Sequence, residues 1–219
     1  MTLKLYAHPF ASYCQKVLIA LYENGTPFEF RMLDADHPEN MAELERLWPF
    51  RKFPVLVDEG RTLIETTVII EHLQLHHPGP VRMIPQEPEA ALDVRFMDRF
   101  FDIYVATPQA SIVFNSIRPE GDRDPYGVVE SRKMLETAYR WLDERMAGRE
   151  WAAGDAFSLA DCAAAPALFY ADWTHPIPEA FPNVLAYRQR LLARPSFARA
   201  VDEARPYRGL FPLGAPDRD

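Results

Sequence analysis

The sequence predicts two structural parts: an α/β part, with a mixed sheet flanked by helices, followed by an all-helical part. Up to His77 the hydrophobic spacing alternates between a period of two, typical of strands, and the longer period typical of helices. After the breaker cluster His77-Pro78-Gly79-Pro80 every periodic segment has helical spacing. We therefore expect one domain over residues 1–77, a linker over 78–88 and a helical domain over 89–219.

The first part begins with a strand, a helix, a strand and a helix. Apolar and polar residues alternate over 3–7, which predicts a half-buried strand. From Ser12 the apolar residues follow helical spacing up to Gly25, with Ser12 as the expected N-cap. A second strand is predicted over 28–33 and a second helix over 41–48.

The stretch from Trp48 to Glu71 adds a hairpin and a third helix. Its first strand begins at Phe53-Pro54, where a proline is tolerated because it needs no ladder hydrogen bond. We expect a cis bond there, which would leave the backbone N–H and C=O of Phe53 free for an extended peptide. The third helix begins at Glu65-Thr66, and the unpaired N–H groups of such a start attract a carboxylate.

These residues resemble the glutathione-binding half of the cytosolic glutathione transferases. The carrying motif is Lys52-Phe53-Pro54-Val55-Leu56 followed by Glu65-Thr66, where the family has K-[VI]-P-x-L and then E-[ST]. The resemblance extends nearly end to end and is to bacterial members of the Ser/Cys type, without a clearly assigned class. It implies a thioredoxin-like first domain, a helical-bundle second domain, glutathione as co-substrate and a homodimer.

The resemblance also implies the roles of four binding residues. Lys52 would pair with the glycine carboxylate of glutathione, and Phe53 would pair with the peptide through its backbone. Glu65 would bind the γ-glutamyl ammonium, and Thr66 would bind the neighbouring carboxylate through its N–H and hydroxyl.

The chain departs from the family pattern at the position of the donor that stabilises the glutathione thiolate. The column that holds the family's serine or cysteine falls on Ala11, which has no donor. Ser12, one residue on, is the predicted catalytic donor, with Tyr6 and Tyr13 as further candidates; a simple capping role for Ser12 is equally compatible. Cys14 has no cysteine partner at Ala11, so we expect a buried core residue and no thiol–disulfide exchange.

Two motifs of the helical part have structural interpretations. Ser158 and Asp161 form an acidic variant of the capping box and mark a helix start. An aromatic run is expected to lie mainly in the core, and in the resembling fold one edge of it would line an apolar pocket. The run comprises Phe96, Phe100, Phe101 and Tyr104.

Composition excludes several classes of function. The formal net charge of -8 argues against nucleic-acid binding, which requires a basic face. The two cysteines suit a reducing cytoplasm, and the absence of a long apolar run leads us to expect neither secretion nor membrane insertion. His72 and His76 are spaced i, i+4 but lack a third ligand with suitable spacing, so no metal is expected.

The predicted function is that of a cytoplasmic glutathione transferase acting in detoxification. The glutathione thiolate would attack a small apolar electrophile held against the second domain. One alternative is a glutathione-dependent isomerase or dehalogenase. Another is a glutathione-binding module without catalysis, which Ala11 permits.

Overall fold

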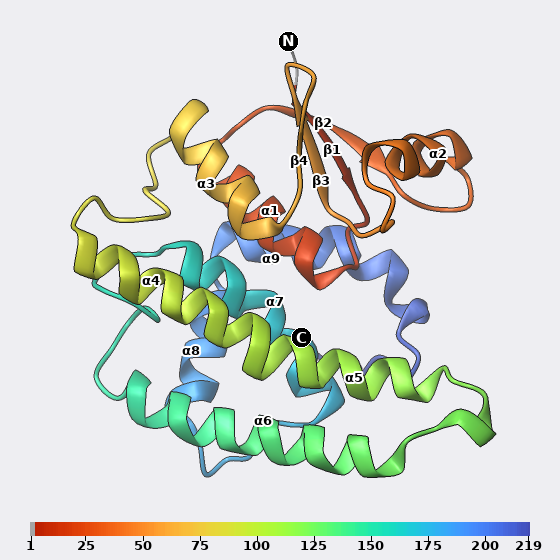
Figure 1. Cartoon of the computed structure of the whole chain (residues 1–219). Coiled ribbons are helices and arrows are strands. Elements are labelled where there is room, and N and C mark those ends of the chain that lie inside the picture. The colour runs from red at the N-terminus through yellow and green to blue at the C-terminus, as the bar shows by residue number, and fades with distance from the viewer. Residues whose placement is uncertain (1–2) are drawn as a thin grey trace.

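The computed structural model describes residues 3–219 and contains a sheet-bearing domain followed by a helical one (Figure 1). The sheet has the order β2-β1-β3-β4, with β1 parallel to β2 and antiparallel to β3. This mixed sheet and the all-helical second domain confirm the predicted fold class. The strands are β1 (Leu3–Ala7), β2 (Phe28–Met32), β3 (Val55–Asp58) and β4 (Arg61–Leu63).

Three helices cover the two faces of the sheet. The face that carries Leu5 and Leu56 packs with α1 (Ser12–Glu23) and α3 (Thr66–His76) in the main hydrophobic core. The opposite face carries Tyr6 and packs against α2 (Pro38–Leu47) in a smaller cluster. Because side chains of a strand alternate between faces, Leu5 and Tyr6 are assigned to opposite sides of the sheet.

The helical domain is built around one fully buried helix, α7 (Leu159–Thr174). Its first turn is held by the predicted capping box, since the Asp161 carboxylate accepts the backbone N–H of Ser158 at 2.9 Å. Around it lie α4 (Pro88–Phe100), a π-helical turn η1 (Phe101–Ala106), α5 (Thr107–Ser116), η2 (Glu120–Asp122), α6 (Pro125–Met146), α8 (Pro182–Leu192), α9 (Pro195–Ala204) and η3 (Arg205–Leu210).

The two domains share a core. Helix α1 packs against α7 and α9 of the helical domain, and α4, η1 and α5 form one long helical rod beneath the sheet-bearing domain (Figure 1). Among residues 3–219 every helix is too short or too polar to span a membrane.

Candidate functional site

The loop between α2 and β3 forms the first wall of the site. The Phe53–Pro54 peptide bond is cis, as expected from the sequence. Phe53 is exposed, and its backbone N–H and C=O form no loop hydrogen bond with the residues that the structure describes. A free backbone donor and acceptor at this place can pair with an extended peptide.

The start of α3 forms the second wall. Glu65 is the N-cap residue, with φ of 66° and ψ of 119°, and its side chain forms no capping bond to its own helix. Its carbonyl accepts the Ile69 N–H at 2.9 Å, so the helical ladder begins there. The N–H groups of Thr66 and Thr67 have no acceptor within the helix and carry the positive end of its dipole, a setting that binds anions.

The helical domain braces this helix start through buried charges. Thr67 donates its hydroxyl to Asp98 Oδ2 at 2.7 Å and accepts from Arg99 Nη2 at 3.0 Å. Lys16 of α1 lies 2.6 Å from Asp98 Oδ1 and 2.9 Å from Asp102 Oδ2, and Arg99 also pairs with Asp102. We call these five residues the interdomain cluster: Lys16, Thr67, Asp98, Arg99 and Asp102.

The interdomain cluster balances its charges, since two cations face two carboxylates. Lys16 is only 1% exposed, and a buried ammonium is tolerated only where carboxylates compensate it. Burial raises the pKa of Asp102, although the Lys16 ammonium opposes that shift.

The sequence does not predict the interdomain cluster. Its only signals in the sequence were a lysine within the first predicted helix and two aspartates four residues apart beside the aromatic run.

The start of α1 corrects the expected role of Ser12. Helix α1 is capped by Ala11, whose carbonyl accepts the Gln15 N–H at 3.0 Å. Ser12 is thus the first helical residue and not the N-cap. Its side chain is half-buried and its hydroxyl forms no hydrogen bond with the described residues. The hydroxyl remains available to a ligand beside the helix start.

The two tyrosines predicted as alternative donors lie in different places. Tyr6 is 1% exposed on the face covered by α2, where it faces Glu43, and burial raises its pKa to about 12. Tyr6 is therefore directed away from the starts of α1 and α3. Tyr13 is 37% exposed, lies among Asp102, Arg99, Thr107 and Glu65, and has a pKa raised to about 12 by burial. A neutral Tyr13 hydroxyl can donate a hydrogen bond between the domains.

Lys52 and Cys14 are the remaining residues that the sequence analysis considered. Lys52 is exposed on the α2–β3 loop and forms no ion pair with the described part of the chain. Cys14 is completely buried in the main core, and burial raises the pKa of its thiol to about 12. A buried, protonated thiol is a core group, which fits the expectation for Cys14.

The aromatic run of α4 and η1 does not line the peptide site. Phe96 and Phe100 pack on Trp141 of α6, with ring centroids 5.8 and 4.5 Å apart, and Tyr104 packs on Phe100. The side of this rod that meets the first domain carries Asp98 and Asp102 instead. Phe100 and Phe101 are buried, as expected for core residues, whereas Phe96 and Tyr104 are 48% and 44% exposed. Helical spacing alone does not say which neighbour each face meets, and an apolar pocket for the electrophile stays a prediction.

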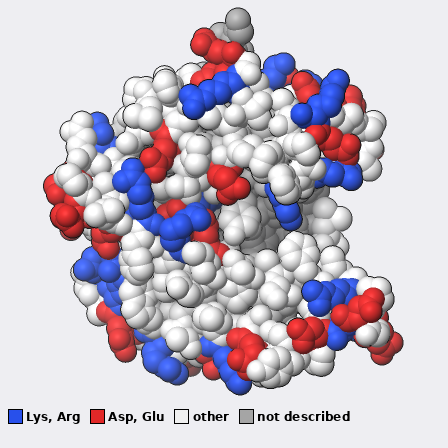
Figure 2. Space-filling model, viewed as in Figure 1, with Lys and Arg blue, Asp and Glu red and all other residues white. Residues whose placement is uncertain are grey.

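The walls described above border an open hollow. Figure 2 shows it between the sheet-bearing domain and the helices below, on the side where Figure 1 places the start of α1, the α2–β3 loop and α5. Phe10 of the β1–α1 loop packs on Tyr170 and Trp173 of α7, with ring centroids 5.5 and 6.4 Å apart, which joins this loop to the helical domain.

Comparison with known proteins assigns this architecture to a family. Residues 5–81 match the glutathione S-transferase N-terminal domain, and residues 105–195 match the glutathione S-transferase C-terminal domain. The chain belongs to the glutathione S-transferase superfamily. These comparisons assign no class within the superfamily.

Individual relatives cover nearly the whole chain. A stringent starvation protein A homolog from Coxiella burnetii is 28% identical over 207 residues, which make up 91% of either protein. The glutathione S-transferase from Methylobacterium radiotolerans, solved with glutathione sulfonate, is 29% identical with a TM-score of 0.78, over 92% of this chain and 95% of that one. The enzyme from Methylobacillus flagellatus, solved with glutathione, is 26% identical with a TM-score of 0.78, over 91% and 98%.

The interdomain cluster yields a stability prediction. Replacing Lys16 with Met removes the buried cation and leaves Asp98 and Asp102 with only Arg99 as a counter-charge. The free energy of unfolding, measured by urea denaturation, is expected to fall by about 3–5 kcal/mol. Lys133→Met is the matched control, because Lys133 pairs with Glu130 in solvent and should leave the unfolding midpoint unchanged. Equal midpoints for both variants would contradict the role of the cluster.

Proposed function

We propose that this protein binds glutathione and transfers its thiolate to an apolar electrophile. The observation that carries the proposal is the start of α3, where the Glu65 side chain makes no capping bond and the N–H groups of Thr66 and Thr67 are unpaired. Glu65 supplies a carboxylate for the γ-glutamyl ammonium, and Thr66 supplies an N–H and a hydroxyl for the adjacent carboxylate. The two similar enzymes solved with glutathione or its sulfonate support the same ligand.

The rest of the tripeptide is assigned to the loop before β3. The backbone of Phe53 pairs with the cysteinyl main chain, in the manner of a peptide added to a sheet edge. Lys52 lies one residue earlier and places an exposed ammonium within reach of the glycine carboxylate. The thiol then lies toward the start of α1, where Ser12 has a free hydroxyl.

The proposed reaction is a nucleophilic substitution or addition. Glutathione loses its thiol proton to solvent, and the hydroxyl of Ser12 donates a hydrogen bond to the thiolate, which stabilises the reactive form. The sulfur then forms a bond to the electrophilic carbon. A leaving group departs with its electron pair, or the substrate takes up the pair and a proton. Glutathione is consumed as a co-substrate, and the hollow beside it holds the electrophile.

A second candidate is a glutathione-binding module without catalysis. Ala11 as N-cap has no donor, and this observation favours that candidate. Product analysis separates the two. A thioether formed with any of a panel of apolar electrophiles supports the transferase. Substrate conversion without glutathione consumption indicates an isomerase, and binding without any conversion indicates the module.

We further propose that the protein acts in the cytoplasm as a homodimer. Both cysteines are buried and free, which suits a reducing compartment.

The support for a dimer comes from the surface. Large apolar side chains are exposed along α3 and the α4–η1 rod, namely Val68, Leu75, Leu92, Phe96 and Ile103. Such a surface favours association with a second copy. Light scattering during size-exclusion chromatography is expected to give twice the mass of the chain, and a monomer at micromolar concentration would contradict the proposal.

The binding prediction concerns Glu65. Glu65→Gln removes the negative charge opposite the ligand ammonium, at a cost of about 1.5–3 kcal/mol for a charged hydrogen bond. Calorimetric titration should therefore show glutathione affinity at least about 10-fold weaker than in the wild type. Glu59→Gln is the matched control, since Glu59 is also acidic with positive φ but lies in the β3–β4 turn. Unchanged affinity in Glu65→Gln would remove the basis of the assignment.

The catalytic prediction concerns Ser12. Ser12→Ala removes one hydrogen bond to the thiolate, so the pKa of the bound glutathione thiol should rise by up to about one unit. Ultraviolet absorption of the thiolate across a pH series measures this shift. Tyr13→Phe is the comparison variant, because it removes the other nearby hydroxyl. A rise confined to Tyr13→Phe would transfer the donor role from Ser12 to Tyr13.

A further inference from the structure

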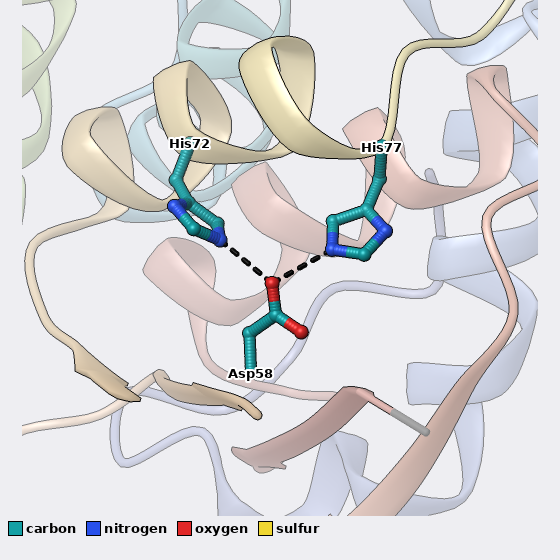
Figure 3. Close-up of side chains that lie close together, drawn as sticks. All are labelled: Asp58, His72 and His77. Carbon is teal, nitrogen blue, oxygen red and sulfur yellow. Dashed lines mark hydrogen bonds and ion pairs between the residues drawn. The ribbon is translucent and has the colours of Figure 1, made fainter. Parts of the chain in front are cut away.

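A second group of chemically active side chains lies at the other end of α3. Asp58 at the end of β3, His72 within α3 and His77 just after it point toward one another (Figure 3). Nε2 of His72 lies 2.8 Å from Asp58 Oδ2, and Nε2 of His77 lies 2.7 Å from the same oxygen. All three potential ligand atoms lie within 4.8 Å of one another.

The end of the helix produces this arrangement. On a continuous α-helix two residues five apart would point about 140° away from each other. The helix ends at His76, and His77 is the C-cap with φ of −132° and ψ of 54°. This departure from helical geometry turns the His77 ring back toward the side of His72. The arrangement is therefore set by the backbone at the helix terminus.

The surroundings leave the group open to a ligand. His72 is 8% exposed and Asp58 is buried, whereas the His77 side chain is 32% exposed. Neither Nδ1 atom nor Asp58 Oδ1 forms a hydrogen bond with the described residues. The three side chains thus form a half-enclosed pocket with one accessible side.

We propose that Asp58, His72 and His77 bind a divalent transition metal ion such as Zn²⁺. Two imidazole nitrogens and a carboxylate oxygen are a common zinc ligand set, and the exposed side next to His77 admits a water molecule as the fourth ligand. Metal binding at Nε2 requires each ring to be neutral with its single proton on Nδ1. A neutral ring reaches this form by moving its proton from Nε2 to Nδ1 through solvent, and a protonated ring by releasing the Nε2 proton to solvent. Bonds of about 2.0–2.2 Å require the ligand atoms to separate to about 3.3 Å, so the His77 side chain must move outward by about half an ångström.

The position of this site defines its role. Its histidines lie about 9 Å (His72) and about 16 Å (His77) along α3 from Thr66, toward the opposite end of the helix from the proposed glutathione site. A metal here would instead fasten the end of α3 to the β3–β4 hairpin. Its ligation is thus independent of glutathione binding.

The neighbouring His76 provides a matched control. Its ring packs on His72 with centroids 4.3 Å apart, but it does not belong to the converging group. From the i, i+4 spacing in the sequence, His72 would pair with His76, and no third ligand has suitable spacing. In the structure the partner is His77, and the third ligand, Asp58, comes from the hairpin.

The test uses the full chain after treatment with a chelator. Titration with Co²⁺, followed by visible absorption, is expected to show one ion per chain with a tetrahedral spectrum. Zn²⁺ should displace the Co²⁺ and raise the melting temperature. His77→Ala should weaken binding by more than about 100-fold, beyond the usual cost of losing an outer-shell partner, while His76→Ala should retain it.

Several outcomes would overturn the proposal. The first is the absence of Co²⁺ binding, and the second is binding by His77→Ala that equals binding by the wild type. The third is loss of binding in His37→Ala, since His37 pairs with Asp34 elsewhere on the surface and is not a proposed ligand. Circular dichroism establishes first that each variant is folded. Asp58→Asn serves as a second ligand variant that preserves side-chain shape and should also lose the metal-dependent rise in melting temperature.

Discussion

The buried pairing of Lys16 with Asp98 and Asp102 is the interaction on which the arrangement of the site depends. It joins α1 of the first domain to α4 and η1 of the second, and Thr67 ties the first turn of α3 into the same group. A buried ammonium without its carboxylates would be very costly, so the two domains hold one relative position. The first turn of α3 is consequently held in place by buried charged groups of α1 and the helical domain.

Among the described residues other than glycine, positive φ angles occur at Arg51 and Glu65, in the two walls of the proposed site, and at Glu59 in the β3–β4 turn. Glu65 adopts φ of 66°, a left-handed conformation that costs a residue other than glycine about 1–3 kcal/mol. This conformation ends the preceding strand abruptly and leaves the first N–H groups of α3 uncapped by Glu65. Arg51, in the loop on the other side of the site, also has a positive φ of 55°. Both walls therefore contain a strained residue, which is common where binding geometry takes precedence over local stability.

The start of α1 presents two hydroxyl groups, those of Ser12 and Tyr13. Ala11 caps the helix through its backbone alone, so Ser12 is free of the capping bond that would otherwise occupy its oxygen. Tyr6 lies on the face of β1 that α2 covers, so its hydroxyl is directed away from the start of α1. Tyr13 lies toward the interdomain cluster, where it faces Asp102, Arg99 and Thr107. Ser12 and Tyr13 are therefore the two hydroxyls that the structure leaves near the start of α1.

The sequence by itself determined the features that arise from local interactions. Strand alternation, the cis Phe53–Pro54 bond, the helix start at Glu65-Thr66 and the capping box at Ser158 each depend on neighbours within a few residues. The tertiary structure alone decided that Lys16 meets Asp102, 86 positions away, that Phe100 faces Trp141, and that Asp58 lies between His72 and His77. Such contacts follow from how whole helices pack, because periodicity defines an apolar face without specifying what covers it.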